Sequence, residues 1–325
     1  MRPGQWRLTY SARGHMPGAD LTFGTEDTGM LLTQEPDITF GDANNGEQPL
    51  PGEDGIRFGR DYVGPMSVTF EAAVSTWGPN SLNTVTEAAE WIKVNALHLP
   101  TGTLMGRSNQ NALSKLRSIW RADAVRAGAG TVASLYHETE ARTRVAYGRP
   151  RRFAPAHSKL FRQGYTPVVA DFQCADDRWY DSAPKVATIQ KSWRPFPTGP
   201  KPIPPPAIGL ARGSVTMLGD MSTWPVITIN GPAVNPVVWI GDQVKFKLLT
   251  FVKPGDWVRV DPRPWVRTVR NAAGTSMGHL LDRSSTRLAE MFVPPGTYSF
   301  GADFDFGTGA WGPVTCSWQD AYGWF

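Results

Sequence analysis

The sequence has few residues of the kinds that build covalent cross-links or metal centres. It contains only two cysteines, Cys174 and Cys316. They lie on opposite sides of the domain boundary inferred below, so a disulfide would have to cross that boundary, and two cysteines alone do not build a zinc site. None of the five histidines is spaced i, i+4 from another, and none neighbours a cysteine. We therefore expect two free, partly buried thiols, no metal and no cofactor.

Long apolar runs are also missing. No segment approaches the ~20 consecutive apolar residues that a membrane-spanning helix needs, and the N-terminal residues lack the apolar core of a signal peptide. We expect no membrane insertion by this chain and synthesis in a cytoplasm-like compartment.

Dense charge of either sign is absent, since the net charge of +4 is spread thinly along the chain. The basic residues that come closest to clustering are Arg149, Arg151 and Arg152, with a weaker stretch at Arg117, Arg121 and Arg126. Nucleic-acid-binding proteins normally carry a denser basic stripe with interleaved aromatics. A solvated or subunit-facing basic surface is the favoured interpretation.

Catalytic signatures are missing too. The nucleophile elbow Gly-x-Ser-x-Gly, the phosphate-binding loop and His-Glu-x-x-His do not occur. The sharpest enzymatic alternative is a glycoside hydrolase, because Asp303 and Asp305 alternate along one strand face, ~7 Å apart. An exposed acidic sheet edge is the favoured interpretation of that pair. We predict that the protein is not an enzyme.

Proline and glycine are abundant, with 28 and 33 residues respectively. A proline-rich run near residues 195–206 can neither continue a helix nor pair as a central strand, because proline lacks the amide donor. A chain of 325 residues is about twice the length of a typical domain. These observations predict a first domain over 1–194, a linker over 195–207 and a second domain over 208–325.

The first domain is predicted to be mainly β with one or two helices packed on it. Residues 63–74 place Val68 and Phe70 on one face of a strand. Apolar residues at helical spacing predict helices over 84–97 and 108–126. Further strands are expected at 6–10, in a pair at 133–137 and 142–148, and in a pair at 164–174 and 184–191.

The second domain is predicted to be a β-sandwich of the jelly-roll type. Its strands are about five to seven residues long and recur about every 8 to 12 residues, separated by Gly, Pro and Asp turns. Seven of the thirteen tryptophans fall in this domain, and Trp311 stands between Gly309 and Gly312. An exposed indole there would suit stacking on a glycan, whereas core packing or a subunit contact is the favoured role.

Four motifs, taken in order, resemble the distal tail proteins, or minor tail proteins, of long-tailed bacteriophages. They are Asp171–Tyr180 (DFQCADDRWY), Trp224–Gly231 (WPVITING), Pro254–Asp261 (PGDWVRVD) and Pro294–Phe300 (PPGTYSF). The similarity is clearest over residues 165–325. It implies a tail-tube-like first domain that forms a ring, and a second domain similar to a galectin or a carbohydrate-binding module.

The resemblance implies a structural virion protein at the distal end of the phage tail, made in the bacterial cytoplasm. Its expected partners are five further copies in a hexameric ring, the tail-tube protein and the tail-tip hub proteins, with genomic DNA only in transit through the lumen. Strand edges in 63–74 and 142–148 and the helix 108–126 are candidate ring contacts. Candidate interface or lumen residues are Arg117, Arg121, Arg149 and Arg151. The alternative is a tip protein that binds a host glycan through Trp311.

Overall fold

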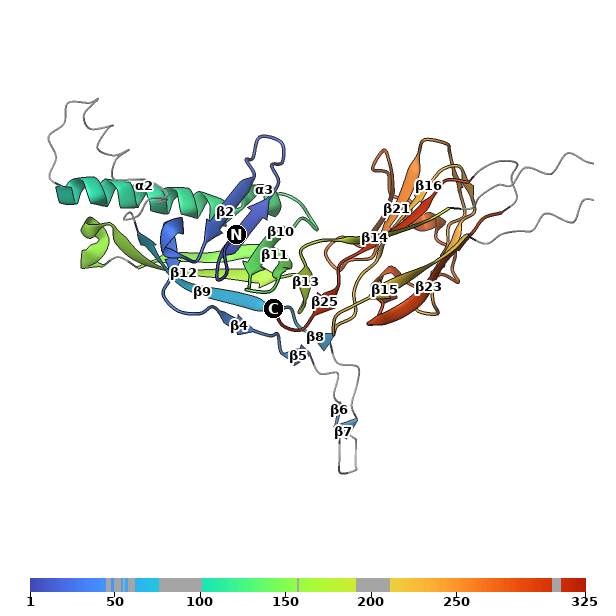
Figure 1. The fold of residues 1–325 in the computed structure, drawn as a ribbon, viewed down its shortest axis with the longest axis horizontal. Helices are drawn as coiled ribbons and strands as arrows, with labels where there is room; N and C mark the ends of the chain where they lie inside the picture. Colours follow the sequence, from blue (N-terminus) through green and yellow to red (C-terminus); the bar gives the residue numbers. More distant parts are fainter. Residues whose placement is uncertain are drawn as a thin grey trace, which may run out of the picture. The chain divides into compact units, whose positions relative to one another are not determined.

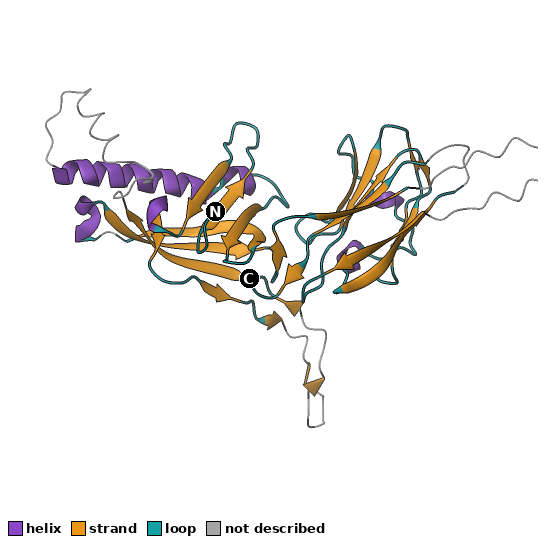
Figure 2. Ribbon diagram, in the orientation of Figure 1, coloured by secondary structure: helices purple, strands orange, loops and turns teal. Residues whose placement is uncertain are grey.

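The computed structural model of the chain describes residues 1–44, 48–49, 54, 56–57, 62–75, 101–156, 158–190, 211–305 and 311–325. These residues form two compact units, each with its own hydrophobic core. The first unit is Met1–Trp179 together with Trp324–Phe325, and the second is Tyr180–Gly323. Strands dominate both units, and one long helix belongs to the first (Figure 1, Figure 2). The prediction of a mainly β protein is confirmed.

The described elements of the first unit follow one another along the chain. In order they are β1 (Trp6–Tyr10), β2 (Ala19–Phe23), the 3-10 helix η1 (Glu26–Thr28), β3 (Met30–Leu32), β4 (Asp37–Thr39), β5 (Ala43–Asn44), β6 (Gln48–Pro49), β7 (Ile56–Arg57), β8 (Tyr62–Val63), β9 (Ser67–Ser75), α2 (Thr101–Arg121), α3 (Asp123–Arg126), β10 (Ala133–Glu138), β11 (Thr143–Pro155), η2 (Lys159–Gln163) and β12 (Tyr165–Cys174). The division between the units falls within β13 (Trp179–Asp181).

One antiparallel sheet organises this unit, in the order β2-β1-β10-β11-β12-β9-β3, with β4 also paired to β9. Its two ends approach each other, because Gly24 N donates to Met30 O at 2.8 Å and Leu32 N donates to Gly24 O at 3.2 Å. The sheet is therefore nearly closed on itself. Along β9, Val68 and Phe70 are fully buried while Glu71 is exposed, as the alternating pattern predicted.

One predicted strand pairing is wrong. The strand expected at 164–174 exists as β12, but its neighbours are β11 and β9. The strand expected at 184–191 exists as β14 (Lys185–Ile189), which pairs with β24 (Val314–Trp318) of the second unit. Alternation of apolar residues identifies a strand and its buried face, whereas its partner is set by contacts distant in sequence.

The predicted helix 108–126 is confirmed in type, with two differences in extent. Helix α2 begins at Thr101, and it ends where Ala122 adopts a left-handed backbone with φ 49°, after which α3 forms one further turn. Leu116 and Trp120 are buried as predicted. The helix lies along one side of the first unit's sheet (Figure 2). The helix predicted over 84–97 lies outside the described residues.

Aromatic side chains fill the first unit's core around Trp120. Its ring lies edge-on to Phe23 and Phe70 at centroid distances of 6.0 and 6.1 Å. Its indole Nε1 donates to the Asp171 carbonyl at 3.2 Å. Burying a side chain of this size is worth about 3 kcal/mol, so this contact fixes α2 on the sheet.

The last residue of the chain belongs to the same core. Phe325 lies edge-on to His137 at 4.5 Å and to Trp179 at 5.3 Å. The other side of His137 stacks on Trp6 at 4.1 Å with an interplanar angle of 15°. The chain thus starts and ends in the first unit, with the second unit inserted between Trp179 and Trp324.

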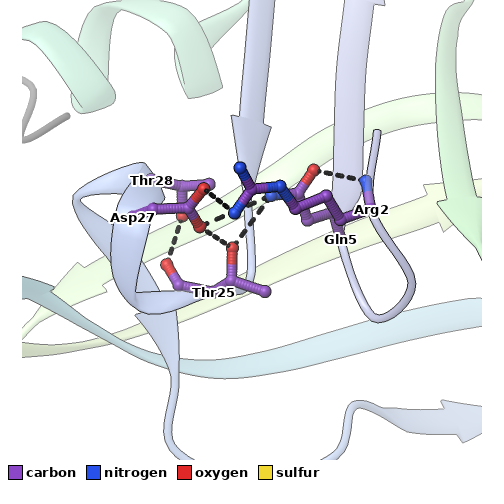
Figure 3. A network of polar contacts seen from close by, with 5 residues as sticks. All are labelled: Arg2, Gln5, Thr25, Asp27 and Thr28. Atoms are coloured by element: carbon purple, nitrogen blue, oxygen red, sulfur yellow. Dashed lines mark hydrogen bonds and ion pairs between the residues drawn. The ribbon is translucent and has the colours of Figure 1, made fainter.

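Polar contacts fix the N-terminal turn to the loop between β2 and β3 (Figure 3). Buried Gln5 accepts from Arg2 N at 2.8 Å and donates to Thr25 Oγ1 at 3.0 Å, while Arg2 Nη1 lies 3.4 Å from Asp27 Oδ2. The Thr25 hydroxyl donates to Asp27, and this bond is the main reason that the pKa of Asp27 lies below its usual value. The network anchors the chain where it enters β1.

The second unit is a two-sheet sandwich. Its further strands are β15 (Ala211–Met217), β16 (Val226–Asn230), β17 (Ala233–Val234), β18 (Val237–Ile240), β19 (Val244–Lys247), β20 (Phe251–Val252), β21 (Trp257–Asp261), β22 (Thr268–Asn271), β23 (Gly296–Asp303) and β25 (Ala321–Tyr322), with 3-10 turns η3 (Gly278–Leu280) and η4 (Leu288–Glu290). The sheet orders are β14-β24-β16-β21-β22 and β15-β23-β18-β19, and β17 pairs with β20.

Both sheets of the sandwich contribute to one core. Ile227 and Val260 from the five-stranded sheet and Phe246 and Phe300 from the four-stranded sheet are all buried in it. Inward and outward side chains alternate, as in Val244 to Phe246, which gives the sandwich its apolar interior. The two-sheet sandwich predicted from the strand spacing is therefore present.

The division between the units differs from the boundary predicted at 195–207. Strand β14 precedes those residues, yet it pairs with β24 and lies in the second unit. In addition, Lys185 of β14 forms an ion pair with the buried Asp320, whose other carboxylate oxygen accepts from Leu218 N at 2.9 Å. The proline-rich run thus falls between two strands of the second unit in sequence, and residues 191–210 lie outside the described residues.

Candidate assembly surface

The four arginines predicted from the sequence divide into two pairs in the structure. Arg117 and Arg121 are exposed on α2, and Arg121 Nε lies 2.8 Å from Asp123 Oδ1. Arg149 and Arg151 lie on β11. The helical pair is solvated and partly neutralised at the surface, where such an ion pair contributes little stability. The β11 pair belongs to a larger group.

Arg149 is held in a fixed position by backbone carbonyls. Its Nε donates to Thr131 O at 2.9 Å and its Nη2 donates to Gly128 O at 2.6 Å. Arg126 reaches the same place from α3, with Nη2 donating to Pro150 O at 3.0 Å. Partial burial lowers the pKa of Arg149, and the nearby charges of Arg151 and Arg126 lower it further. The structure therefore brings together arginines that the sequence separates.

A β-bulge exposes the remaining members of the group. The pairing of β11 with β12 shifts between Pro150 and Phe153, so that Arg151 and Arg152 both stand out from the sheet. Arg151 Nε donates to Gln173 Oε1 at 2.9 Å. We name the set Arg126, Arg149, Arg151 and Arg152 the arginine cluster. Within the described part of the chain, no carboxylate forms an ion pair with it.

Acidic residues gather around β4. Glu35, Asp37 and Asp42 are exposed, and no ion pair joins any of them to a basic side chain among the described residues. We name these three the acidic strip. The loop-rich composition of this segment gave no reason to single them out, since isolated surface carboxylates are common in loops.

Two exposed aromatics accompany the acidic strip. Phe40 directly follows β4 and is 40% exposed, and Trp324 is 56% exposed. Their ring centroids lie 6.1 Å apart. Large aromatics exposed together are typical of the core of a protein interface. The pair joins residues distant in sequence, so no local pattern indicated it.

The strand edges predicted as ring contacts are covered within the subunit. Strand β9 pairs with β12 on one side and with β3 and β4 on the other, so the strand edge expected in 63–74 is occupied within the subunit. The edge expected in 142–148 is likewise occupied, because β11 pairs there with β10 and its Tyr147 carbonyl accepts from Ala175 N at 2.6 Å. Side chains rather than free strand edges are left to make contacts at these places.

The predicted glycan contact is a packed side chain. Trp311 is 8% exposed and stacks on Phe304, with centroids 5.1 Å apart and planes 8° from parallel. One indole face is thus covered by Phe304, and the side chain belongs to the core of the sandwich.

The two carboxylates of the enzymatic alternative serve local contacts. Asp303 accepts from the backbone N of Phe304, while Asp305 accepts from Asn235 Nδ2 at 2.8 Å and lies 4.0 Å from Lys247 Nζ. Asp303 ends β23, and Asp305 is exposed beyond it. Neither carboxylate lines the two pockets found in the described structure.

The described residues also bear on metal binding, thiol reactivity and membrane spans. No group of three or more His, Cys, Asp or Glu side chains is placed to hold a metal ion there. Cys174 and Cys316 are free and buried, and burial raises the pKa of both thiols, that of Cys316 to about 12. Among the described helices, none is long and apolar enough to span a membrane.

Comparison with known proteins gives a match only at the level of structure. The sequence matches no profile of a known protein family and no curated protein. The fold is similar to that of the Dit protein of phage SPP1, which is described as a paradigm of the hub adsorption apparatus in phages that infect Gram-positive bacteria. The alignment has a TM-score of 0.54 and 13% sequence identity, and it covers 97% of this chain and 98% of the Dit chain. A chain of the phage P2 baseplate in its activated conformation with Ca aligns over 96% of this chain and 97% of its own length, at 11% identity and a TM-score of 0.45. The likeness to the SPP1 Dit protein therefore shows a shared fold over nearly the whole length of the chain.

Proposed function

We propose that the chain is a distal tail protein, a structural component of a phage tail tip that forms a ring, of six copies, between the tail tube and the tail-tip hub. The observation that carries this proposal is the full-length likeness to the SPP1 Dit protein, which extends over both units. Four motifs between residues 171 and 300 resemble the same family at the level of sequence.

The two units suit different tasks in such a ring. The first has a nearly closed sheet stiffened by α2, and both chain ends are anchored in its core, which makes it a rigid block for coaxial stacking on the tube. The second is an inserted sandwich with its own core, so its surface is available for neighbouring tip proteins. A closed ring of identical blocks requires a head-to-tail interface in which two different surfaces meet.

The proposal makes the protein part of the virion, at the distal end of the tail. Its partners are further copies of itself, the tail-tube protein above and the hub proteins below, and the DNA passes through the lumen only in transit. We propose no enzymatic activity, because Asp303 and Asp305 are engaged locally. The burial of Trp311 gives no support to glycan binding at that residue.

Negative-stain electron microscopy of the purified chain tests the proposal. We expect end-on views of closed rings with a central opening, and stacks of rings on tail-tube protein when the two are mixed. Small particles of single-chain size, both alone and in the presence of tail-tube protein, would contradict it. A bovine serum albumin sample at the same mass concentration controls for ring-like aggregates on the grid.

A further inference from the structure

We propose that the arginine cluster of one copy binds the acidic strip and the Phe40–Trp324 pair of the next copy, so that this contact forms the head-to-tail interface. This inference rests on the proposed ring, because it assigns the two surfaces that such a ring requires. It concerns only residues of the first unit.

The register of the sheet places the two surfaces at opposite ends of one row. Arg149 is aligned with Gln173 of β12, Gln173 with Ser67 of β9, and Ser67 with Thr39 of β4. The row crosses four adjacent strands, so its ends lie about 14 Å apart across the sheet. Surfaces at opposite ends of a block can both be occupied at once, as every subunit of a closed ring requires.

Both ends of the row are available to side chains. Beyond Gly148, strand β11 extends past the end of β10 and stays paired with β12, while the Pro150 and Arg151 carbonyls accept from Arg126 Nη2. At the other end, β4 pairs with β9 on one side, and no described strand pairs with its second side. Exposed side chains at both ends, among them Arg151 and Asp37, are therefore free to meet another copy.

The charges of the two surfaces are opposite in sign, and neither surface forms ion pairs within the described part of the subunit. Arg126 and Arg149 bond to neutral carbonyls, and Arg151 bonds to a neutral amide. Within the described structure, the guanidinium groups of the cluster have no counter-ion, and their mutual repulsion contributes to the lowered pKa of Arg149. Carboxylates accept guanidinium groups through paired hydrogen bonds, so a carboxylate surface relieves this repulsion.

The exposed aromatic pair adds an apolar centre to the acidic surface. Guanidinium groups stack on indole and phenyl faces as well as binding carboxylates, and interfaces are enriched in arginine and aromatic residues together. A surface that combines Asp37 with Phe40 and Trp324 offers both kinds of contact to one arginine cluster. Nucleic acid, in contrast, would account for the arginines and leave the acidic strip with its aromatics unexplained.

Cysteine cross-linking tests the contact directly. We would introduce Asp37→Cys and Arg151→Cys into the full chain, each alone and both together, and oxidise the purified proteins. Both positions are exposed, whereas the native Cys174 and Cys316 are buried and contribute no background. The matched control replaces Arg151→Cys by Arg142→Cys, because Arg142 is an exposed arginine directly before the first residue of β11.

The expected result is a ladder of disulfide-linked oligomers from the double variant, with at least a tenfold larger cross-linked fraction than the Asp37→Cys, Arg142→Cys control. A mixture of the two single variants should give linked dimers. Cross-linking at the control level overturns the interface. If Arg151→Glu weakens binding of a duplex DNA while cross-linking stays at the control level, the cluster is a nucleic-acid surface and the interface is again overturned.

Light scattering on the unmodified chain separates this inference from the proposed function. If the unmodified chain forms a closed oligomer but the double variant does not cross-link, the proposed ring stands and the proposed interface is overturned. If the double variant cross-links selectively but the unmodified chain forms only open dimers, the interface is supported and the closed ring is overturned. Charge reversal gives a second, independent test of the interface. Arg151→Glu should lower the oligomer fraction at least tenfold, and adding Asp37→Arg to the same chain should restore it.

Discussion

Replacing His137 by phenylalanine should remove a large part of the acid sensitivity of the first unit. The imidazole lies between Trp6 and Phe325 and is 9% exposed, and this burial lowers its pKa from 6.5 to about 4, although Glu138 acts in the opposite direction. A buried imidazole is neutral in the folded state because its charged form has lost its hydration.

The sign and size of the effect follow from linkage. Because the folded-state pKa is the lower one, the unfolded chain takes up a proton as the pH falls below 6.5, and folding stability is lost between pH 6.5 and pH 4. A pKa difference of about 2.5 corresponds to about 3.4 kcal/mol once the pH is below 4, and to about 2 kcal/mol at pH 5 relative to pH 7.5. Above pH 7 the group contributes no pH dependence.

Hydrogen exchange with mass spectrometry, at increasing urea concentration, gives the unfolding free energy of each unit from its own peptides. We expect peptides of β1 and β10 to lose about 2 kcal/mol more stability between pH 7.5 and pH 5 in the wild type than in His137→Phe. Peptides of β16 and β21 serve as an internal reference, and His279→Gln, at an exposed histidine of the second unit, is the matched control. An equal pH dependence of the wild type and His137→Phe would refute the reasoning.

Three further outcomes follow from the packing. Cys174 and Cys316 should react with Ellman's reagent at pH 8 only in denaturant, and prompt reaction of the native chain would contradict their burial and raised pKa values. Asp320→Ala should destabilise the second unit by about 3 kcal/mol in urea unfolding, since it removes a buried ion pair and a hydrogen bond to a backbone amide; a change below about 0.5 kcal/mol would count against that role. Gly148→Ala should destabilise the first unit by about 2 kcal/mol because its Cβ would lie 2.1 Å from a carbonyl oxygen, whereas Gly106→Ala in α2, with nothing closer than 3.9 Å, should be neutral or stabilising.

The spacing of apolar residues along the chain predicted the strands and helices whose buried face is set by that spacing. The alternation of Val68 and Phe70 identified β9 and its buried face, and the helical spacing of Leu116 and Trp120 identified α2. The break of that helix at Ala122 was not predictable, because alanine favours the helix and its left-handed backbone is imposed by the surrounding structure.

Long-range contacts account for what the sequence did not reveal. Strand β14 has an ordinary strand pattern, and only its pairing with β24 assigns it to the second unit. The return of Phe325 to the core of the first unit has no local signal. The same holds for the arginine cluster: Arg126 and Arg149 lie in separate weakly basic stretches, and the contact of α3 with β11 brings them together.

The mass of the purified chain in solution tests the central claim most directly. Multi-angle light scattering at several protein concentrations and moderate salt should give a closed species near six times the 35.7 kDa chain, with a mass that does not change on dilution. A species of 35.7 kDa at every concentration, both alone and mixed with tail-tube protein, would contradict the ring.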